Sequence, residues 1–167
     1  MYLLPRYSGD ELLIYLRKSR TDDPLMTVEE ILERHEQRIR EWLGRNLPDA
    51  GAVPEGNFFR EVGSGETIDS RPRMQALLRA IESPNKKAII CVEPSRLSRG
   101  DLEDIGYLVK VLRYTNTIVI TMDYVYDLND ERDREQFQRE LMRGNDYLEY
   151  AKKVMHLKVR TLLPIPT

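Results

Sequence analysis

Residues 11–18 read ELLIYLRK, and this stretch decides the fold. Its apolar part is short and uninterrupted and ends abruptly in charge, which is typical of a buried strand. The carboxyl end of the predicted strand carries Arg17, Lys18 and Ser19. Two cations and a hydroxyl are therefore expected at one edge of the sheet to which this strand belongs.

Strands and helices alternate along the following hundred residues. Residues 88–92 (AIICV) are continuously apolar, as in a central strand of a parallel sheet. Thr27, with Glu30 three residues later, has the pattern of a capping box that opens a helix. This alternation predicts an α/β fold with a central, mostly parallel sheet flanked by helices. The predicted strands are 11–18, 58–62, 88–92 and 117–122, and the predicted helix caps are Thr27, Asp69 or Ser70, and Asp101.

The last part of the chain has a different pattern. From about residue 130 no strand is indicated, and apolar residues recur at alternating spacings of four and three. This heptad seam predicts a long C-terminal dimerisation helix over about 131–157, ~40 Å long at 1.5 Å per residue. The alternative is a terminal helix that lies on the domain's own sheet. The seam residues are Phe137, Leu141, Gly144, Leu148, Ala151 and Met155. We expect a catalytic domain over 1–129 and an oligomerisation helix and linker over 130–167.

The composition is typical of a soluble protein, and we expect it to be cytoplasmic. Hydrophobic residues make up 41% of the chain and charged residues 32%. No apolar run approaches the ~18 residues of a membrane span, and residues 1–10 lack the pattern of a signal peptide. Cys91 is the only cysteine and there are two histidines, so we expect no metal site and no cofactor.

The charge balance bears on the class of partner. A net charge of −2 argues against a chain whose bulk field holds nucleic acid tightly. The cations are nevertheless 19 Arg against 7 Lys, and guanidinium forks match phosphate oxygens well. A GC-rich genome explains the same bias, so the positions of the arginines have to decide.

Several arginines are predicted to meet at one edge of the sheet. Ligands of an open parallel sheet gather beyond the carboxyl ends of its strands. The first strand delivers Arg17 and Ser19 to this edge, the second leads to Arg71, and the third leads to Arg96 and Arg99. Four guanidiniums around one hydroxyl suit a phosphorus centre that develops negative charge.

Two other kinds of active site fit less well. A Ser–His–Asp hydrolase requires a histidine beside the serine, and neither His35 nor His156 lies on a strand-end loop. A metal-dependent phosphatase requires paired carboxylates, which the predicted strand ends lack.

Three segments resemble, in the same order, the signature segments of the serine recombinases (the resolvase/invertase superfamily). Residues 15–19 (YLRKS) resemble its Y-x-R-x-S signature. Residues 61–71 (EVGSGETIDSR), followed by Pro72, resemble an acidic-x-x-S-G segment that runs into an Arg-Pro helix start. Residues 95–99 (SRLSR) resemble its D-R-L-x-R segment. The resemblance covers about residues 11 to 160 and implies an N-terminal catalytic domain.

The resemblance implies a role for each matching residue. Ser19 attacks a DNA phosphodiester, becomes a 5′-phosphoserine and frees a 3′-hydroxyl, so that rejoining needs neither ATP nor a metal. Arg96 assists the leaving oxygen. Glu61 and His35 lie near the site, with a structural role as the alternative for both. The scissile phosphate is held by Arg17, Arg71, Arg96 and Arg99, and the DNA backbone is contacted by Ser64, Gly65 and Ser95.

The sequence departs from the family pattern at one position. The family has an aspartate immediately before the arginine at position 96, and this chain has Ser95. The aspartate would orient an arginine or accept a proton. We expect Glu93 or Glu61 to substitute, or no carboxylate to be needed.

The resemblance also implies the partners. These are double-stranded DNA at specific recombination sites and further copies of the chain, as dimers and as tetramers on DNA, with no membrane. The loops at 21–26 and 47–57 favour large serine recombinases, of integrase or transposase type, over compact resolvases. Family members carry DNA-binding domains beyond the long helix, so we expect this chain to be a fragment. The alternatives are a non-catalytic dimerisation or regulatory module and a phosphoryl-transfer enzyme that does not act on DNA.

Overall fold

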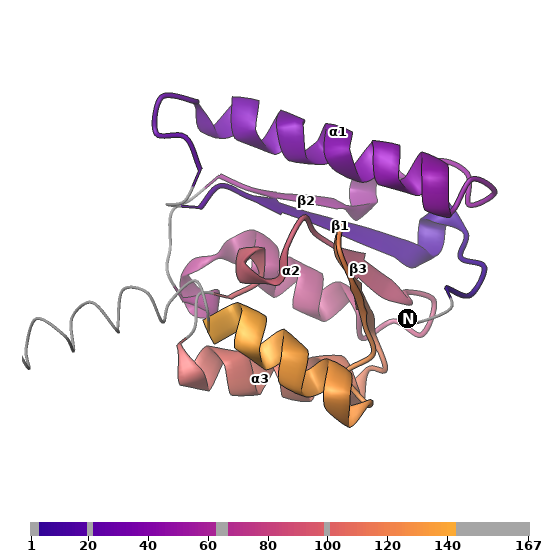
Figure 1. Ribbon diagram of the computed structural model, residues 1–167, viewed down its shortest axis with the longest axis vertical. Helices are drawn as coiled ribbons and strands as arrows, with labels where there is room; N and C mark the ends of the chain where they lie inside the picture. The colour runs from indigo at the N-terminus through magenta and orange to yellow at the C-terminus, as the bar shows by residue number, and fades with distance from the viewer. Residues whose placement is uncertain (1–3, 20–21, 63–66, 99–100, 143–167) are drawn as a thin grey trace, which may run out of the picture.

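A five-stranded sheet forms the centre of the molecule. The computed structural model describes residues 4–19, 22–62, 67–98 and 101–142 (Figure 1). Four strands are parallel, and the edge strand β5 is antiparallel to β4. In spatial order the strands are β2 (Phe58–Glu61), β1 (Leu12–Arg17), β3 (Ala88–Ile90), β4 (Ile118–Ile120) and β5 (Val125–Tyr126). The predicted α/β class with a mostly parallel sheet is confirmed.

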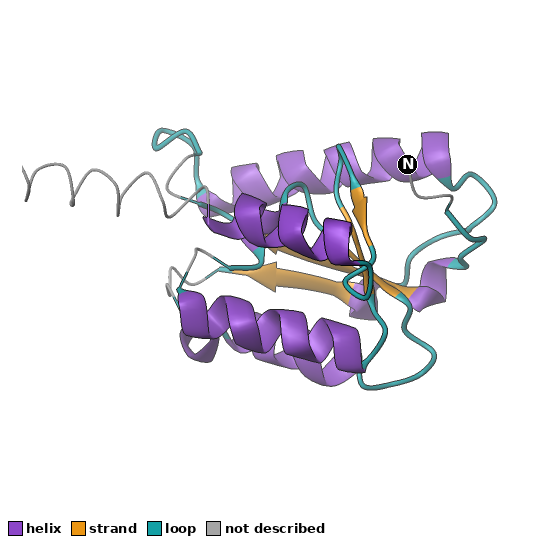
Figure 2. Cartoon of the chain, turned by 60° about the horizontal axis from the view of Figure 1, so that its bottom comes forward, coloured by secondary structure: helices purple, strands orange, loops and turns teal. Residues whose placement is uncertain are grey.

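Helices cover both faces of this sheet (Figures 1 and 2). Helix α1 (Val28–Asn46) lies on one face, and α2 (Pro72–Ala80) and α3 (Leu102–Tyr114) lie on the other. A further helix begins at residue 131 and continues to the last described residue, 142. None of the described helices is both long enough and apolar enough to cross a membrane.

Strand β1 connects the two halves of the core. Leu12, Ile14 and Leu16 pack with α1, whereas Leu13 and Tyr15 pack with α2 and α3. Successive side chains of a strand point to opposite faces, so a strand covered by helices on both sides is apolar at every position. This explains why residues 12–16 read as an uninterrupted apolar run.

Two of the predicted helix starts are confirmed. The Thr27 side chain accepts a hydrogen bond from the Glu30 amide, and the Glu30 carboxylate accepts one from the Thr27 amide. These two bonds form the expected capping box of α1. Asp101 accepts the amides of Glu103 and Asp104 and caps α3. Both caps join residues two or three positions apart, which is why local sequence predicts them.

The predicted cap of α2 is wrong. Asp69 and Ser70 belong to a short 3-10 turn (Ile68–Ser70), and Arg71 takes the N-cap position without a side-chain bond. The first amides of the helix are bound by Glu61, which follows from the fold and not from the neighbouring sequence.

The strand β5 was not predicted from sequence. It has only two residues, and a turn in which Thr121 donates its amide to the carbonyl of Tyr124 returns it alongside β4. A segment this short carries too little alternation to be recognised.

The segment after residue 130 contributes to the domain's own core. Phe137 and Leu141 are fully buried, and the Phe137 ring packs edge-on against Tyr126 at 5.3 Å between centroids. The predicted seam positions from Gly144 onward lie outside the described residues. The division of the chain near residue 129 and the dimerisation helix therefore stay predictions.

Candidate active site

The predicted site lies where the sheet changes its winding direction. The strand order β2-β1-β3-β4-β5 places β1 beside β3, and the chain runs outward from this pair in both directions. Ligands of such sheets bind beyond the carboxyl ends of the two strands at the switch point. Here β1 ends at Arg17, and β3 leads into the 3-10 turn Pro94–Arg96.

Arg17 extends from β1 to the segment after β3. Its Nε donates to the carbonyl of Arg96 at 2.8 Å, and its Nη2 donates to the carbonyl of Ser95 at 2.7 Å. Arg17 itself is only 2% exposed. Arg17 thus fixes the backbone of the 94–96 turn to the end of β1.

Arg71 binds the same segment from the N-terminus of α2. Its Nη1 donates to the carbonyl of Leu97 at 2.9 Å, and its Nε donates to Thr67 at 3.3 Å. The residue has no exposed surface. Arg17 and Arg71 together bring the three predicted strand-end segments into one cluster, as expected, but their donors face backbone carbonyls.

Arg96 is held by two carboxylates. Its Nη2 lies 3.1 Å from Oδ1 of Asp22 and 2.7 Å from Oε1 of Glu93. Its Nη1 also donates to Asp22 and, at 3.2 Å, to the carbonyl of Arg17. The acidic residue that the sequence led us to seek beside Arg96 is therefore supplied by two side chains, of which only Glu93 was anticipated.

Asp22 also binds the candidate nucleophile. The amide of Ser19 donates to Oδ2 of Asp22 at 2.7 Å, and the amide of Asp22 donates to the carbonyl of Ser19 at 3.1 Å. Ser19 is half-buried. Burial opposes ionisation of Asp22, but the bonds from Arg96 and from the Ser19 amide outweigh it and lower the pKa of this carboxyl.

Asp22 is the residue that sequence reasoning missed. It lies three residues after Ser19 in a turn-rich loop, and aspartate in such turns commonly binds a backbone amide. That local bond could have been anticipated. The pairing with Arg96, 74 residues away, could not.

His35 lies beside this carboxylate on α1. Its Nε2 is 3.7 Å from Oδ1 of Asp22, and the residue is buried. Burial, and then the charge of Arg96, lower the pKa of His35 to about 4. His35 is therefore near the site, as expected, and is neutral at neutral pH.

Glu61 has a structural position. Its Oε1 accepts the Tyr15 hydroxyl at 3.0 Å and the Met74 amide at 2.9 Å, and its Oε2 accepts the Arg73 amide at 3.1 Å. Anionic oxygens at a helix N-terminus satisfy amides that have no partner within the helix. Glu61 caps α2 and does not bind Arg96, so it does not substitute for the missing aspartate.

The edge of the sheet retains unused hydrogen-bond donors. Among the described residues, the buried side-chain atoms without a partner include Nη2 of Arg71, Nε of Arg96 and Oγ of Ser98. A buried polar atom without a partner costs ~1–3 kcal/mol. Each of these atoms is buried, so an anion at this edge would interact with the positive charge of the arginines and not with these donors directly.

Three predicted site residues lie outside the described residues, namely Arg99, Ser64 and Gly65. Ser95 lies in the cluster with a half-buried side chain, and its carbonyl binds Arg17. Within the part of the chain that the structure describes, no three His, Cys, Asp or Glu side chains form a group that could hold a metal ion.

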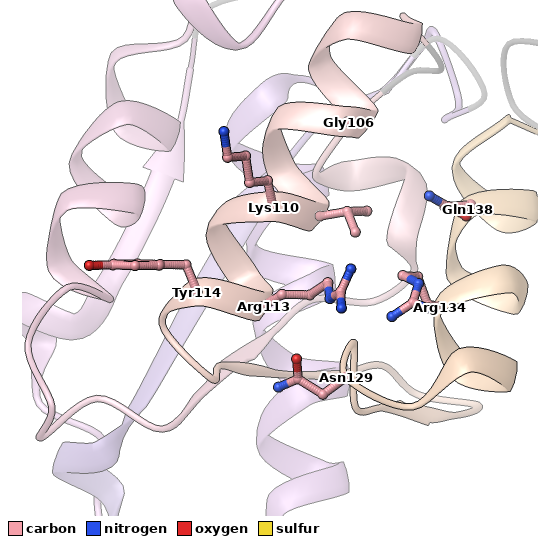
Figure 3. A pocket seen from close by; sticks show the side chains of 8 residues that line it. Gly106, Lys110, Arg113, Tyr114, Asn129, Arg134 and Gln138 are labelled. Atoms are coloured by element: carbon pink, nitrogen blue, oxygen red, sulfur yellow. The ribbon is translucent and has the colours of Figure 1, made fainter.

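A second basic feature lies elsewhere on the molecule. A groove of about 490 Å³ lies between α3 and the helix that begins at residue 131. Arg113 and Arg134 face each other across it (Figure 3). Arg113 is twelve residues beyond Asp101, the N-cap of α3, and so lies ~18 Å along the helix from that cap. The Tyr114 hydroxyl points away from the two arginines (Figure 3). The groove is lined by the cations Lys110, Arg113 and Arg134 and suits an anion.

Comparisons with known proteins identify the family and the fold. Residues 12–158 match the family described as "Resolvase, N terminal domain". The chain is similar to the N-terminal catalytic domain of TP901-1 integrase, with 18% identity, a TM-score of 0.58, and 84% of this chain and 98% of that one covered. It is also similar to the C-terminal catalytic domain of ISC1926 TnpA, an IS607-like serine recombinase, with 14% identity, a TM-score of 0.50, and 76% and 93% covered. At these low identities the structural similarity shows a shared fold alone, whereas the family match spans most of the chain. The chain therefore belongs to the resolvase N-terminal domain family, the catalytic domains of serine recombinases.

Proposed function

We propose that this chain cleaves and rejoins DNA at specific recombination sites, with Ser19 as the nucleophile. The observation that carries the proposal is the pairing at the switch point. Ser19 follows β1, Arg96 follows β3, and the Asp22 carboxylate binds both. Asp22 thereby links the backbone of the serine to the guanidinium at a ligand-binding edge, and a nucleophile and a positive charge are two groups that phosphoryl transfer uses.

The proposed cleavage step is a transesterification. Ser19 Oγ loses its proton and attacks phosphorus, the bond between Oγ and phosphorus forms, and the bond between phosphorus and the 3′-oxygen breaks. The 3′-oxygen takes up a proton and leaves as a hydroxyl, and the 5′-phosphate stays on the serine. Attack by a 3′-hydroxyl on this ester reverses the step and rejoins DNA. The number of ester bonds is unchanged, so no ATP is consumed, and we propose no metal.

The arginines have different parts in this proposal. Arg96 shares its Nη2 with the half-exposed Glu93, so an incoming phosphate can replace Glu93 at little cost. Arg17 and Arg71 are buried against carbonyls of residues 95–97, and direct contact with the phosphate would require this segment to shift. In the arrangement described, they contribute positive potential and hold the segment in place.

The finer assignments rest on the family. We infer double-stranded DNA as the substrate, with dimers that associate into tetramers on DNA, and an integrase or transposase type of reaction. Ser64, Gly65, Ser95 and Arg99 are proposed to contact the DNA. We also infer that the protein acts in the cytoplasm.

The covalent intermediate provides the test. The full-length protein is incubated with a recombination site that carries a nick, which traps the cleaved state, and the adduct is located by mass spectrometry. We expect DNA on Ser19, no adduct with Ser19→Ala, and an unchanged adduct with the exposed control Ser83→Ala. Adduct formation should persist in EDTA. An adduct on another residue, or none at all, would refute the proposal.

A further inference from the structure

We propose that Asp22 is the positioning residue that aligns Ser19 with Arg96, and that it replaces the aspartate absent from position 95. The inference rests on the function proposed above, because it concerns the same cleavage step. No family signature segment contains Asp22, and it is identified by its contacts alone.

Both oxygens of the Asp22 carboxylate are occupied by the two groups that it would align. Oδ2 accepts the Ser19 amide at 2.7 Å and a bond from Nη1 of Arg96. Oδ1 accepts Nη2 of Arg96 at 3.1 Å. Paired contacts to both terminal nitrogens fix the plane of a guanidinium as well as its position. Asp22 therefore sets the orientation of Arg96 relative to the backbone of Ser19.

The loop that carries Asp22 is fastened to the end of β1. The amide of Asp22 returns a bond to the carbonyl of Ser19 at 3.1 Å. A little further along, Nζ of Lys18 donates to the carbonyl of Met26 at 2.7 Å. The loop is thus attached to the end of β1 at two points, and this restrains the Asp22 carboxylate as a positioning role requires.

Asp22 and Glu93 differ in how easily a ligand can displace them from Arg96. The side chain of Asp22 is 12% exposed, whereas that of Glu93 is 47% exposed. A phosphate that arrives from solvent meets Glu93 first, and repulsion between the two anions favours its release. Asp22 lies behind the guanidinium and can stay bound. Glu93 is therefore the exchangeable partner and Asp22 the permanent one.

The neighbouring groups keep Asp22 in its charged form. Arg96 faces it directly, and His35, at 3.7 Å, is neutral at neutral pH. The carboxylate reaches Arg96 from the loop after β1 and not from the arginine's own segment. At position 95 the backbone carbonyl is already bound by Arg17. In this proposal a carboxylate still binds Arg96, but it comes from position 22 of the chain and not from position 95.

The test compares Asp22→Asn with the matched control Asp23→Asn in the full-length protein. Asp23 lies in the same loop and is exposed, and among the described residues its side chain binds the Leu25 amide. Three quantities are measured for each protein: the rate of adduct formation on Ser19 at saturating DNA, the Kd for the DNA site, and the unfolding midpoint. We expect Asp22→Asn to slow the rate about 100-fold, because small misplacements of reacting groups have effects of this size. Its Kd should stay within about threefold, and the control should match the wild type in both.

A second variant keeps the test decisive if Asp22→Asn does not fold. Asp22→Ser retains a short acceptor for the turn and removes the charge that orients Arg96, and it should show the same loss of rate. Glu93→Gln should slow the rate far less than either Asp22 variant does, because the incoming phosphate replaces Glu93 at Arg96.

Three results would overturn the inference: a rate within threefold of the wild type for folded Asp22 variants, a rate above the wild type, or an equal loss for Glu93→Gln. The proposed function fails separately, if the wild type itself forms no adduct on Ser19.

Discussion

Glu61 offers the sharpest test of how the site is supported, because its signature position had allowed either a catalytic or a structural role. The residue is 2% exposed, and its carboxylate joins β2 to the N-terminus of α2 and to the buried hydroxyl of Tyr15. We predict that Glu61→Gln lowers stability and leaves cleavage by Ser19 within about threefold of the wild type.

The magnitude follows from the three hydrogen bonds. The amide of Glu61→Gln keeps one acceptor oxygen for Tyr15 and Met74, and it loses the bond from the Arg73 amide and the favourable interaction with the helix dipole. These two losses amount to about 1–2 kcal/mol. In Glu61→Ala the Tyr15 hydroxyl and the Met74 amide also lose their acceptor, which raises the cost to about 3–5 kcal/mol.

Urea denaturation followed by circular dichroism measures the difference, and thermal unfolding should show a midpoint lower by about 2–8 °C for Glu61→Gln. Glu82→Gln, an exposed change of the same type, should stay within about 0.5 kcal/mol. The reasoning is refuted if Glu61→Gln is as stable as the wild type. It is equally refuted if the folded variant loses cleavage activity by more than about 100-fold.

Three further predictions concern buried groups and one helix. The folded protein holds the pKa of His35 at about 4 against 6.5 for the unfolded chain, so the unfolded state binds the extra proton and stability falls as the pH drops from about 6.5 to about 4, by up to ~1.4 kcal/mol per pH unit. Urea titrations at pH 5 and 7 should show a weaker dependence for His35→Gln, and an equal one would contradict the assignment. Burial raises the pKa of Cys91 to about 12, so a disulfide reagent at pH 8 should label this thiol only after unfolding, and rapid labelling of the native protein would show that the site is open. Gly44→Ala in α1 meets no neighbouring atom and should stabilise the protein by about 0.5–1 kcal/mol, whereas a methyl group at Gly9 would overlap the carbonyl of Ala52 and should cost about 1–3 kcal/mol. Thermal unfolding of both variants should show a higher midpoint for Gly44→Ala and a lower one for Gly9→Ala.

Much of the fold was predictable because its signals are local. The apolar run after residue 11 predicts a strand, and Thr27 and Asp101 predict helix starts, because the bonds concerned join residues two or three positions apart. The start of α2 was assigned wrongly for the opposite reason. Its amides are bound by Glu61, and the capping side chain comes from a neighbouring strand.

The candidate site divides in the same way. Local sequence places Ser19 and Arg17 at the end of a buried strand, and in the structure Arg17 and Arg71 both bind the carbonyl of Arg96. Their phosphate contacts stay a prediction. Local sequence does not show that Arg71 is fully buried, because this depends on the segment of residues 95–97 that covers it.

By itself, the sequence determined the order of the four parallel strands and their helices, and the strand ends that carry the serine and the arginines. Strands and helices repeat every two and 3.6 residues, and helix caps bind residues two or three positions away, so neighbouring residues alone indicate them. Only the tertiary structure decided which carboxylate pairs with Arg96. Asp22 and Arg96 are brought together by β1 and β3, which are adjacent in the sheet although far apart in the chain. Pairing of this kind depends on the packing of the whole domain, which no local pattern specifies.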